Sequence, residues 1–204
     1  MILKEILLFF ALKYDGDFQS ILKALQRKEK VTNQQREEAV SKVQSKYTTI
    51  LCDDYPEALK QISCPPFVLF YHGNLSLLDE KCIGVIGKRV PSEYGTSVTD
   101  KIVCDLVKNE YTIVSGMALG IDTLAHRSAM NNHGKTIAVL GSGINYCYPK
   151  RNRELYLKLK EEHLIVSEHP NDYVPQAKDF PDNPSTHPHI SSLLSERLLL
   201  PHFY

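Results

Sequence analysis

The amino-acid sequence has no excess of charge of either sign. Its 24 Lys and Arg residues balance 24 Asp and Glu residues, so the formal net charge is zero. A chain without net charge has no overall field to attract a polyanion, and a nucleic-acid site would have to be a local basic patch. With 204 residues, 43% of them hydrophobic and 24% charged, the composition excludes a disordered or collagen-like chain. We expect one main domain and a small accessory region.

The sequence also lacks a long hydrophobic run. The most apolar stretch lies within Met1–Leu12, which is far shorter than the ~20 residues that a membrane span needs. No small-residue cleavage site follows it, which argues against a secretory signal. We therefore expect no membrane partner, and we predict that this stretch forms an amphipathic helix buried against the rest of the protein.

Metal-ligand spacing is absent as well. The five cysteines show neither close pairing nor the spacing of zinc ligands, and they are typical of reduced thiols in a cytosolic protein. His187 and His189 flank a proline without the further ligands that a metal site requires. We predict no metal, no other cofactor and a cytoplasmic location.

Short apolar runs alternate with helix-length amphipathic segments in the middle of the chain. The runs rich in Ile and Val predict strands, and the longer segments between them predict helices. This alternation requires right-handed crossovers and a parallel sheet with helices on both faces. The fold class is therefore α/β, with a Rossmann-like, doubly wound and mostly parallel sheet. The predicted strands are Cys82–Ile86, Tyr111–Val114, Thr136–Leu140 and Leu164–Val166, and the predicted helices are Glu93–Lys108, Gly120–Met130 and Asn152–Glu162.

The two ends of the chain differ from this pattern. Residues 1–50 are predicted to form a helical N-terminal region, in which Phe18, Ile21, Leu22 and Leu25 line one face of a helix. Residues 51–204 are assigned to the Rossmann-like domain. From Pro170 onward, repeated prolines interrupt regular structure. We predict an irregular tail over residues 170–204, in which 198–200 is a candidate for one further strand.

Three predicted strands end in glycine-rich turns, at residues 84–89, 115–122 and 141–143. In a doubly wound sheet, ligands bind outside the carboxyl ends of the strands, where such turns gather. Glycine allows a ligand to approach the backbone N–H groups, and the next helix N-terminus adds a partial positive charge. A single tight turn needs glycine whatever it binds. Three such turns in one sheet, with Lys88 and Arg89 beside the first, favour a phosphate-bearing ligand.

Known nucleotide motifs match these turns poorly. The dinucleotide fingerprint fails after Gly143, because Tyr146 stands where its third glycine belongs. The run from His133 to Thr136 imitates the end of a P-loop but precedes a predicted strand instead of following one. Ser115 lacks the context of a G-x-S-x-G nucleophile. An alternative remains a nucleotide-binding or nucleoside-monophosphate-hydrolysing Rossmann-like enzyme, although the PGGxGT-E motif of such hydrolases is not found.

The same segments resemble the DNA-processing protein A (DprA/Smf) family. Residues 86–89 with Tyr94-Gly95 resemble its VGSR segment and the tyrosine-glycine that follows. Residues 115–126 are similar to its SGxAxGID-x-x-AH signature, and 134–143, 148–152 and 167–168 resemble its later blocks in the same order. Phe180-Pro181 resembles the start of its FPxRNR motif, although the arginines of that motif are missing here. The resemblance covers residues 55–181.

The resemblance implies a cytoplasmic, non-catalytic bacterial protein. Its implied function is binding of single-stranded DNA and loading of the RecA recombinase during DNA-mediated transformation. Family members continue well beyond the length of this chain with elements that carry dimerisation, so a homodimer stays open.

The resemblance and the glycine-rich turns together give a set of site residues. Arg89 can donate two hydrogen bonds to one phosphate, whereas Lys88 and Lys150 act as point charges. Asp122, near a helix N-terminus, and His126, one turn later, are predicted to be structural and hydrogen-bonded to each other. No catalytic residue is predicted. Without the family, the basic residues at 150–153 are equally explained as a solvated helix start. The predicted DNA-binding residues are Gly87, Lys88, Arg89, Ser115, Gly116, Gly120, Lys150, Arg151 and Asn152.

Overall fold

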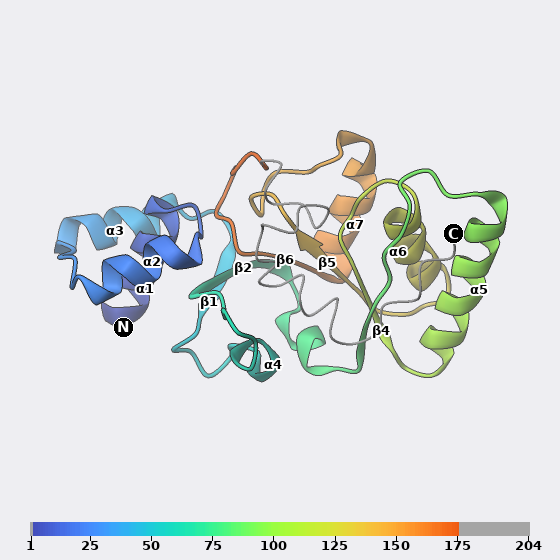
Figure 1. The fold of residues 1–204 in the computed structure, drawn as a ribbon, viewed down its shortest axis with the longest axis horizontal. Coiled ribbons are helices and arrows are strands. Elements are labelled where there is room, and N and C mark those ends of the chain that lie inside the picture. Colours follow the sequence, from blue (N-terminus) through green and yellow to red (C-terminus); the bar gives the residue numbers. More distant parts are fainter. Residues whose placement is uncertain (1, 176–204) are drawn as a thin grey trace. The chain divides into compact units, whose positions relative to one another are not determined.

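The computed structural model describes residues 2–175 of the chain. Its strands form a six-stranded sheet in the order β1-β2-β6-β5-β4-β3 (Figure 1). Strands β3, β4 and β5 run parallel to one another, whereas β1 is antiparallel to β2. The predicted α/β class with a mostly parallel sheet is confirmed. The strands are β1 (Lys46–Thr49), β2 (Val68–Gly73), β3 (Cys82–Gly84), β4 (Thr112–Ser115), β5 (Thr136–Leu140) and β6 (Leu164–Ser167).

The helices of the alternating region lie where the sequence predicts them. Helix α5 (Glu93–Lys108) has the predicted bounds, α6 (Ile121–Asn131) begins after Gly120, and α7 (Arg153–Glu162) begins after Asn152. Strand β3 ends at Gly84, two residues before the predicted end. The sequence did not predict the short elements α4 (Glu57–Lys60) and η1 (Leu75–Asp79), which have too few residues to show a periodic pattern.

The described residues divide into two compact units. The first comprises residues 2–71, 141–146 and 167–175, and the second comprises 72–140 and 147–166. This division interleaves the two units along the chain, so the predicted domain boundary at residue 50 stays a prediction.

The first unit contains α1 (Ile2–Lys13), α2 (Phe18–Gln26) and α3 (Asn33–Lys42), drawn in blue in Figure 1. The opening apolar run forms α1, which buries Leu8 and Phe10. One polar contact joins α3 to α1, and another caps the start of α3. Arg36 of α3 donates to Glu5 of α1 at 2.6 Å, and Thr32 caps α3 by accepting a hydrogen bond from the backbone of Gln35.

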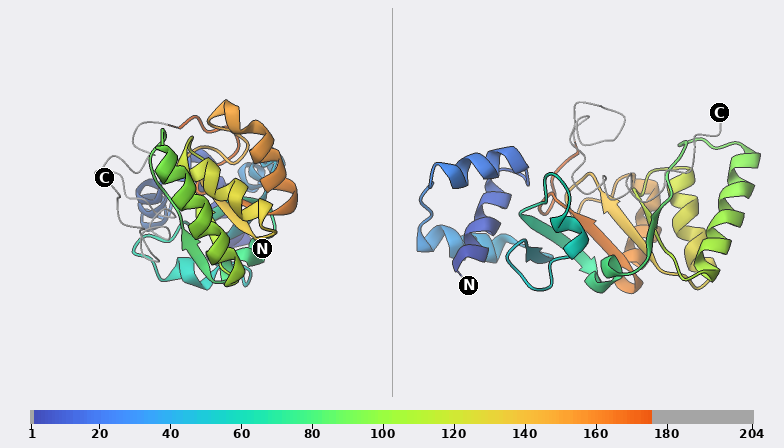
Figure 2. Two further views of the ribbon diagram at one scale, coloured as in Figure 1. Left: turned by 90° about the vertical axis from the view of Figure 1, so that its right-hand side faces the viewer. Right: turned by 60° about the horizontal axis from the view of Figure 1, so that its bottom comes forward.

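The second unit holds the strand–helix alternation. Helices α5 and α6 pack side by side (Figure 2). Their apolar faces meet β3 and β4 in a core that contains Val103, Ile113, Ala125 and Ala129. Ser92 caps the N-terminus of α5 by accepting a hydrogen bond from the Gly95 amide at 3.1 Å. This core fixes the starts of α5 and α6 relative to the strand ends that precede them.

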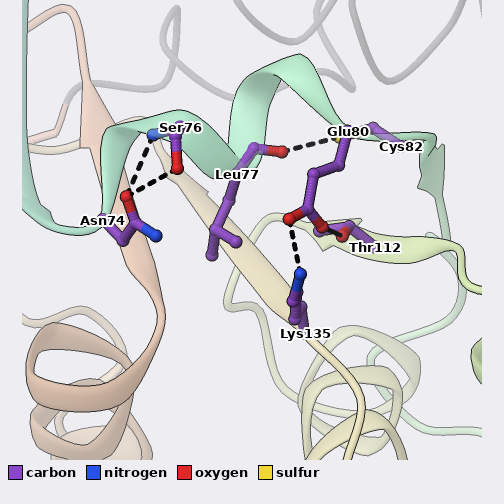
Figure 3. Close-up of polar contacts among 7 residues, drawn as sticks. All are labelled: Asn74, Ser76, Leu77, Glu80, Cys82, Thr112 and Lys135. Carbon is purple, nitrogen blue, oxygen red and sulfur yellow. Dashed lines mark hydrogen bonds and ion pairs between the residues drawn. The ribbon is translucent and has the colours of Figure 1, made fainter.

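A carboxylate links the amino-terminal ends of three strands in this unit. Glu80, just before β3, accepts hydrogen bonds from the Thr112 hydroxyl at 2.7 Å and the Lys135 ammonium at 2.5 Å (Figure 3). Burial alone would raise the pKa of Glu80, but these partners lower it below its ordinary value. Because parallel strands share one direction, this edge lies opposite the glycine-rich turns that follow β3 and β4.

Several predictions fall outside the described residues. They concern Phe180-Pro181, the pair His187 and His189, and the candidate strand at 198–200, together with most of the predicted irregular tail. Within residues 2–175, no helix combines the length and the apolar character that a membrane crossing requires.

Candidate functional site

The turn after β3 exposes the basic pair of the predicted site. The Val85 amide donates to the Val114 carbonyl at 2.9 Å, which extends the parallel pairing by one residue. Beyond that point Gly87, Lys88 and Arg89 are all exposed. The Lys88 carbonyl then accepts a hydrogen bond from the Ile121 amide at 3.2 Å. The basic turn is therefore fixed to the N-terminus of α6.

Gly120 makes this attachment possible. Its backbone has a φ of +83°, which L side chains rarely adopt, and a Cβ there would lie 2.2 Å from the Lys88 carbonyl oxygen. The two turns of the predicted site are thus in direct backbone contact. The signature glycine at 120 serves close packing of the basic turn and does not itself need to touch a ligand.

Asp122 organises the turn after β4. Its Oδ2 accepts hydrogen bonds from the amides of Gly116, at 3.1 Å, and Ala118, at 3.3 Å. Burial raises the pKa of Asp122, while hydrogen bonds from the backbone of Ala118, Gly116 and Gly87 act in the opposite direction. These amides point to a carboxylate of the protein. They do not point outward to a ligand, in contrast to the anion site that the glycine-rich turn predicts.

Hydrogen bonds from the side chains of Ser115 and Asn152 fix the ends of the same turn. The Ser115 hydroxyl donates to the Val85 carbonyl at 2.6 Å, which joins the ends of β3 and β4. The Asn152 amide donates to the Met117 carbonyl and to the Thr123 hydroxyl, each at 2.8 Å. Met117 has a φ of +65°, a strained value for a residue other than glycine. Ser115 and Asn152 are both buried, so the structure gives them a positioning role in place of the predicted contact with DNA.

Asn152 also attaches a second basic segment to the turn after β4. It belongs to the short 3-10 helix η2 (Lys150–Asn152), on which Lys150 and Arg151 are exposed. Because Asn152 is bonded to Met117 and Thr123, the two cations are held on a segment attached to the β4 turn. The structure therefore links all nine predicted DNA-binding residues into one region of the second unit.

His126 has a different partner from the predicted one. Its Nδ1 lies 2.7 Å from the Thr136 hydroxyl oxygen, and that hydroxyl donates to the Ile113 carbonyl at 2.8 Å. Nδ1 therefore carries the proton, and no hydrogen bond joins His126 to Asp122, whose acceptors serve backbone amides. Helical spacing made the pair plausible, but β5 brings Thr136 closer to the ring. Both side chains are buried and hydrogen-bonded within the fold, and their structural role stays a prediction.

The third glycine-rich turn, in the first unit, is not an open anion site. The amides of Gly143, Ile144 and Asn145 donate to the carbonyls of Tyr173, His169 and Asn171 at 2.8, 3.3 and 2.9 Å. A Cβ on Gly143 would lie 2.3 Å from the Tyr173 nitrogen. Glycine is needed here because another segment of backbone packs against the turn, and the interpretation of this turn as a phosphate cradle is wrong.

Exposed apolar residues lie close in the sequence to the basic pair, and the sequence analysis did not predict their exposure. Val90 is 86% exposed, Tyr94 is 68% exposed and Ile86 is 37% exposed. The family-like pattern included Tyr94, but nothing in the pattern shows which way its ring points.

Within the described part of the chain, no cluster of three or more His, Cys, Asp or Glu side chains could hold a metal ion.

A Rossmann-like sheet with an exposed basic pair at the carboxyl ends of its parallel strands defines a domain suited to an anionic ligand. The family model of DNA recombination-mediator protein A matches residues 46–185, and the chain belongs to this family. The predicted family resemblance is confirmed.

Relatives in this family are similar over the same region. The chain is 43% identical to protein Smf of Synechocystis over 132 residues, which cover 63% of this chain and 33% of that protein. It is 44% identical to DNA processing protein DprA of Streptococcus pneumoniae over 133 residues, 65% of this chain and 47% of that protein. The chain therefore matches between a third and a half of the length of these relatives.

Two solved structures share the fold. The crystal structure of Streptococcus pneumoniae DprA has a TM-score of 0.68 and 36% identity, covering 80% of this chain and 56% of that one. The DprA structure from Helicobacter pylori, described for its unique single-stranded DNA binding mode, has a TM-score of 0.59 and 30% identity, covering 67% and 62%.

Proposed function

We propose that this chain binds single-stranded DNA through the phosphate backbone, with Lys88 and Arg89 as the main contacts. The observation that carries the proposal is the exposed basic pair on a turn that Gly120 and Ile121 fix against the N-terminus of α6. A preorganised guanidinium loses little entropy when it donates to a phosphate. Family membership and the Helicobacter pylori relative support a single strand as the ligand.

The internal hydrogen bonds favour side chains over backbone amides as the groups that hold the phosphate. Since the amides of Gly116 and Ala118 donate to Asp122, the charged side chains supply the attraction. Lys150 and Arg151 extend it along the strand, as a groove for single-stranded DNA requires. Gly87, Gly116 and Gly120 shape the backbone beneath these side chains.

The test of this assignment compares two arginines of the second unit. Arg89→Ala should weaken binding to a fluorescein-labelled oligo-dT by roughly 10-fold or more, because a charge-assisted, bidentate contact is worth about 1.5–3 kcal/mol. The matched control is Arg127→Ala, which removes an exposed arginine from the second half of α6. Fluorescence anisotropy titrations at low salt give both affinities. Equal losses in the two variants would remove Arg89 from the site.

We propose no catalysis at this edge. Ser115, Asp122 and His126 are the reactive side chains of the family-like signature, and each is buried and hydrogen-bonded within the fold. Incubation with nucleoside monophosphates should release no free base. Release of free base would instead support the hydrolase alternative.

We further propose that the chain assists RecA loading in recombination and natural transformation and acts in the cytoplasm. Family membership supports the first of these roles, and the five free cysteines are compatible with a reducing compartment. RecA filament formation on an oligonucleotide, followed with and without the chain, tests the loading role. The family resemblance leaves a homodimer open, and sedimentation equilibrium tests it.

A further inference from the structure

The segment between β3 and α5 combines two kinds of exposed side chain. Lys88 and Arg89 are cationic, and Val90 and Tyr94 follow them with 86% and 68% of their surface exposed. Isolated apolar residues are common on protein surfaces and need no explanation. Here the apolar side chains lie within a few residues of the cations proposed to hold phosphate, and this proximity calls for a ligand with both anionic and apolar parts.

Tyr94 is presented on a firm support. It lies in the first turn of α5, where Ser92 accepts a hydrogen bond from the Gly95 amide at 3.1 Å. The Thr99 hydroxyl donates to the Gly95 carbonyl at 2.8 Å, one turn further along the helix. The backbone on both sides of Tyr94 is therefore fixed, while the ring itself is directed away from the core. A rigid aromatic ring of this kind can bind a flat partner with little loss of side-chain entropy.

A single strand of DNA has the matching chemistry. It offers phosphates to Lys88 and Arg89 and, unlike a duplex, the unpaired faces of its bases to an aromatic ring. In a duplex the base faces are occupied by stacking within the helix, so an exposed tyrosine gains nothing from them. Aromatic stacking also tolerates any base, because every base has a π-face. Such a ring would therefore select strandedness without selecting sequence.

We propose that Tyr94 stacks on a base of the bound strand and makes binding selective for single-stranded over duplex DNA. This inference rests on the proposed function. It assigns to Tyr94 a role that the charged residues cannot fill, because phosphates are present in both kinds of DNA.

The experiment compares Tyr94→Ala and Tyr94→Phe with the wild type. Three ligands of equal length are used: oligo-dT, an abasic oligonucleotide with the same number of phosphates, and a duplex. Tyr94→Ala should bind oligo-dT roughly 10-fold or more weakly, as expected for the loss of one stacked base. Its affinity for the abasic strand and for the duplex should match that of the wild type. Tyr94→Phe should keep the affinity for oligo-dT, because the ring is retained.

Tyr111→Ala is the matched control. Tyr111 is 37% exposed and directly precedes β4, at the edge of the sheet opposite the site, so its removal should leave all three affinities unchanged. Cooperative unfolding of each variant in urea shows that the fold is kept.

The outcomes separate this inference from the proposed function. If the wild type binds oligo-dT and Tyr94→Ala binds it equally well, the stacking role is overturned and the phosphate contacts stand. An equal loss toward oligo-dT and the abasic strand would also overturn it, because the ring would then only support the turn. Loss of binding to anionic lipid vesicles with oligo-dT affinity intact would assign Tyr94 to a membrane surface. A wild type that binds no oligo-dT would reject the proposed function itself.

Discussion

His126 is held in its neutral form inside the second unit. Burial, assisted by nearby His163, lowers the pKa of His126 from 6.5 to about 3. Its Nδ1 is bonded to Thr136, and its Nε2 has no hydrogen-bond partner among the described residues. An unfolded chain would take up a proton on this ring near pH 6.5, where the native protein does not. The stabilisation from the neutral ring is therefore full above about pH 6.5 and is lost as the pH falls toward the native pKa.

The substitution His126→Asn tests the predicted loss of stability at low pH. Asparagine keeps a donor for Thr136 but does not titrate, so the free energy of unfolding of His126→Asn should fall less on acidification. Between pH 7 and pH 4.5, the wild type should lose about 2–3 kcal/mol more than the variant. Urea unfolding at the two pH values measures this difference. The raised pKa of Asp122 acts with the opposite sign, but it is common to both proteins. Parallel losses would show that His126 is not responsible.

Single residues show where the sequence was informative and where it was not. The glycines at 120 and 143 both follow strands, yet one lets a basic turn approach a helix and the other accepts an incoming backbone segment. Sequence alone gives the need for glycine but not the neighbour that imposes it. Arg89 is exposed in the structure, and its contact with DNA stays a prediction. The partner of His126 lies on β5, ten residues away, and only the tertiary structure selects it.

At the scale of elements, the site is a joint between the β3 turn and helix α6. Lys88 and Arg89 are positioned by backbone contacts with Gly120 and Ile121. A side chain at position 120 would separate the two elements. The joint therefore predicts both a stability change and a change in DNA affinity from one glycine.

Gly120→Ala should lower the free energy of unfolding by about 2 kcal/mol or more, since alanine is strained at positive φ and its Cβ would meet the Lys88 carbonyl. The affinity for oligo-dT should fall as well, because the basic turn is displaced. Gly95→Ala is the control. It lies in the first turn of α5, and its Cβ would come no closer than 3.4 Å to Ser92 Oγ, so its stability should stay equal or rise by roughly 0.5–1 kcal/mol. Urea denaturation measures the free energy of unfolding of both variants. Equal stability of Gly120→Ala and Gly95→Ala would contradict the close contact between the β3 turn and α6.

The alternating elements were predictable because each strand is a short apolar run and each helix a longer amphipathic one. Helix α5 matches its predicted bounds for this reason. Strand β1 was missed, since Lys46–Thr49 is only four residues long and half polar, and it is defined by its antiparallel pairing with β2. Pairing of this kind is a tertiary property that a local pattern does not contain.

Because the whole molecule has zero net charge, attraction of a polyanion depends on local charge alone. Lys88, Arg89, Lys150 and Arg151 are exposed in one unit, so attraction for a polyanion arises there without an overall field. Such a patch should act over about one Debye length and weaken steeply with salt. The chain matches 33–47% of the length of two curated relatives, and functions that depend on their remaining length stay proposals for this chain.

The most direct measurement of the central claim is the salt dependence of oligo-dT binding. For a single strand, log K falls with log salt, and the magnitude of this negative slope decreases by about 0.7 for each phosphate contact removed. The double variant Lys88→Ala/Arg89→Ala should therefore show a slope shallower than that of the wild type by about 1.4. The double control Lys81→Ala/Arg127→Ala removes the same charges from exposed positions away from the turn and should keep the wild-type slope. A wild-type slope in both double variants would contradict phosphate binding at this turn.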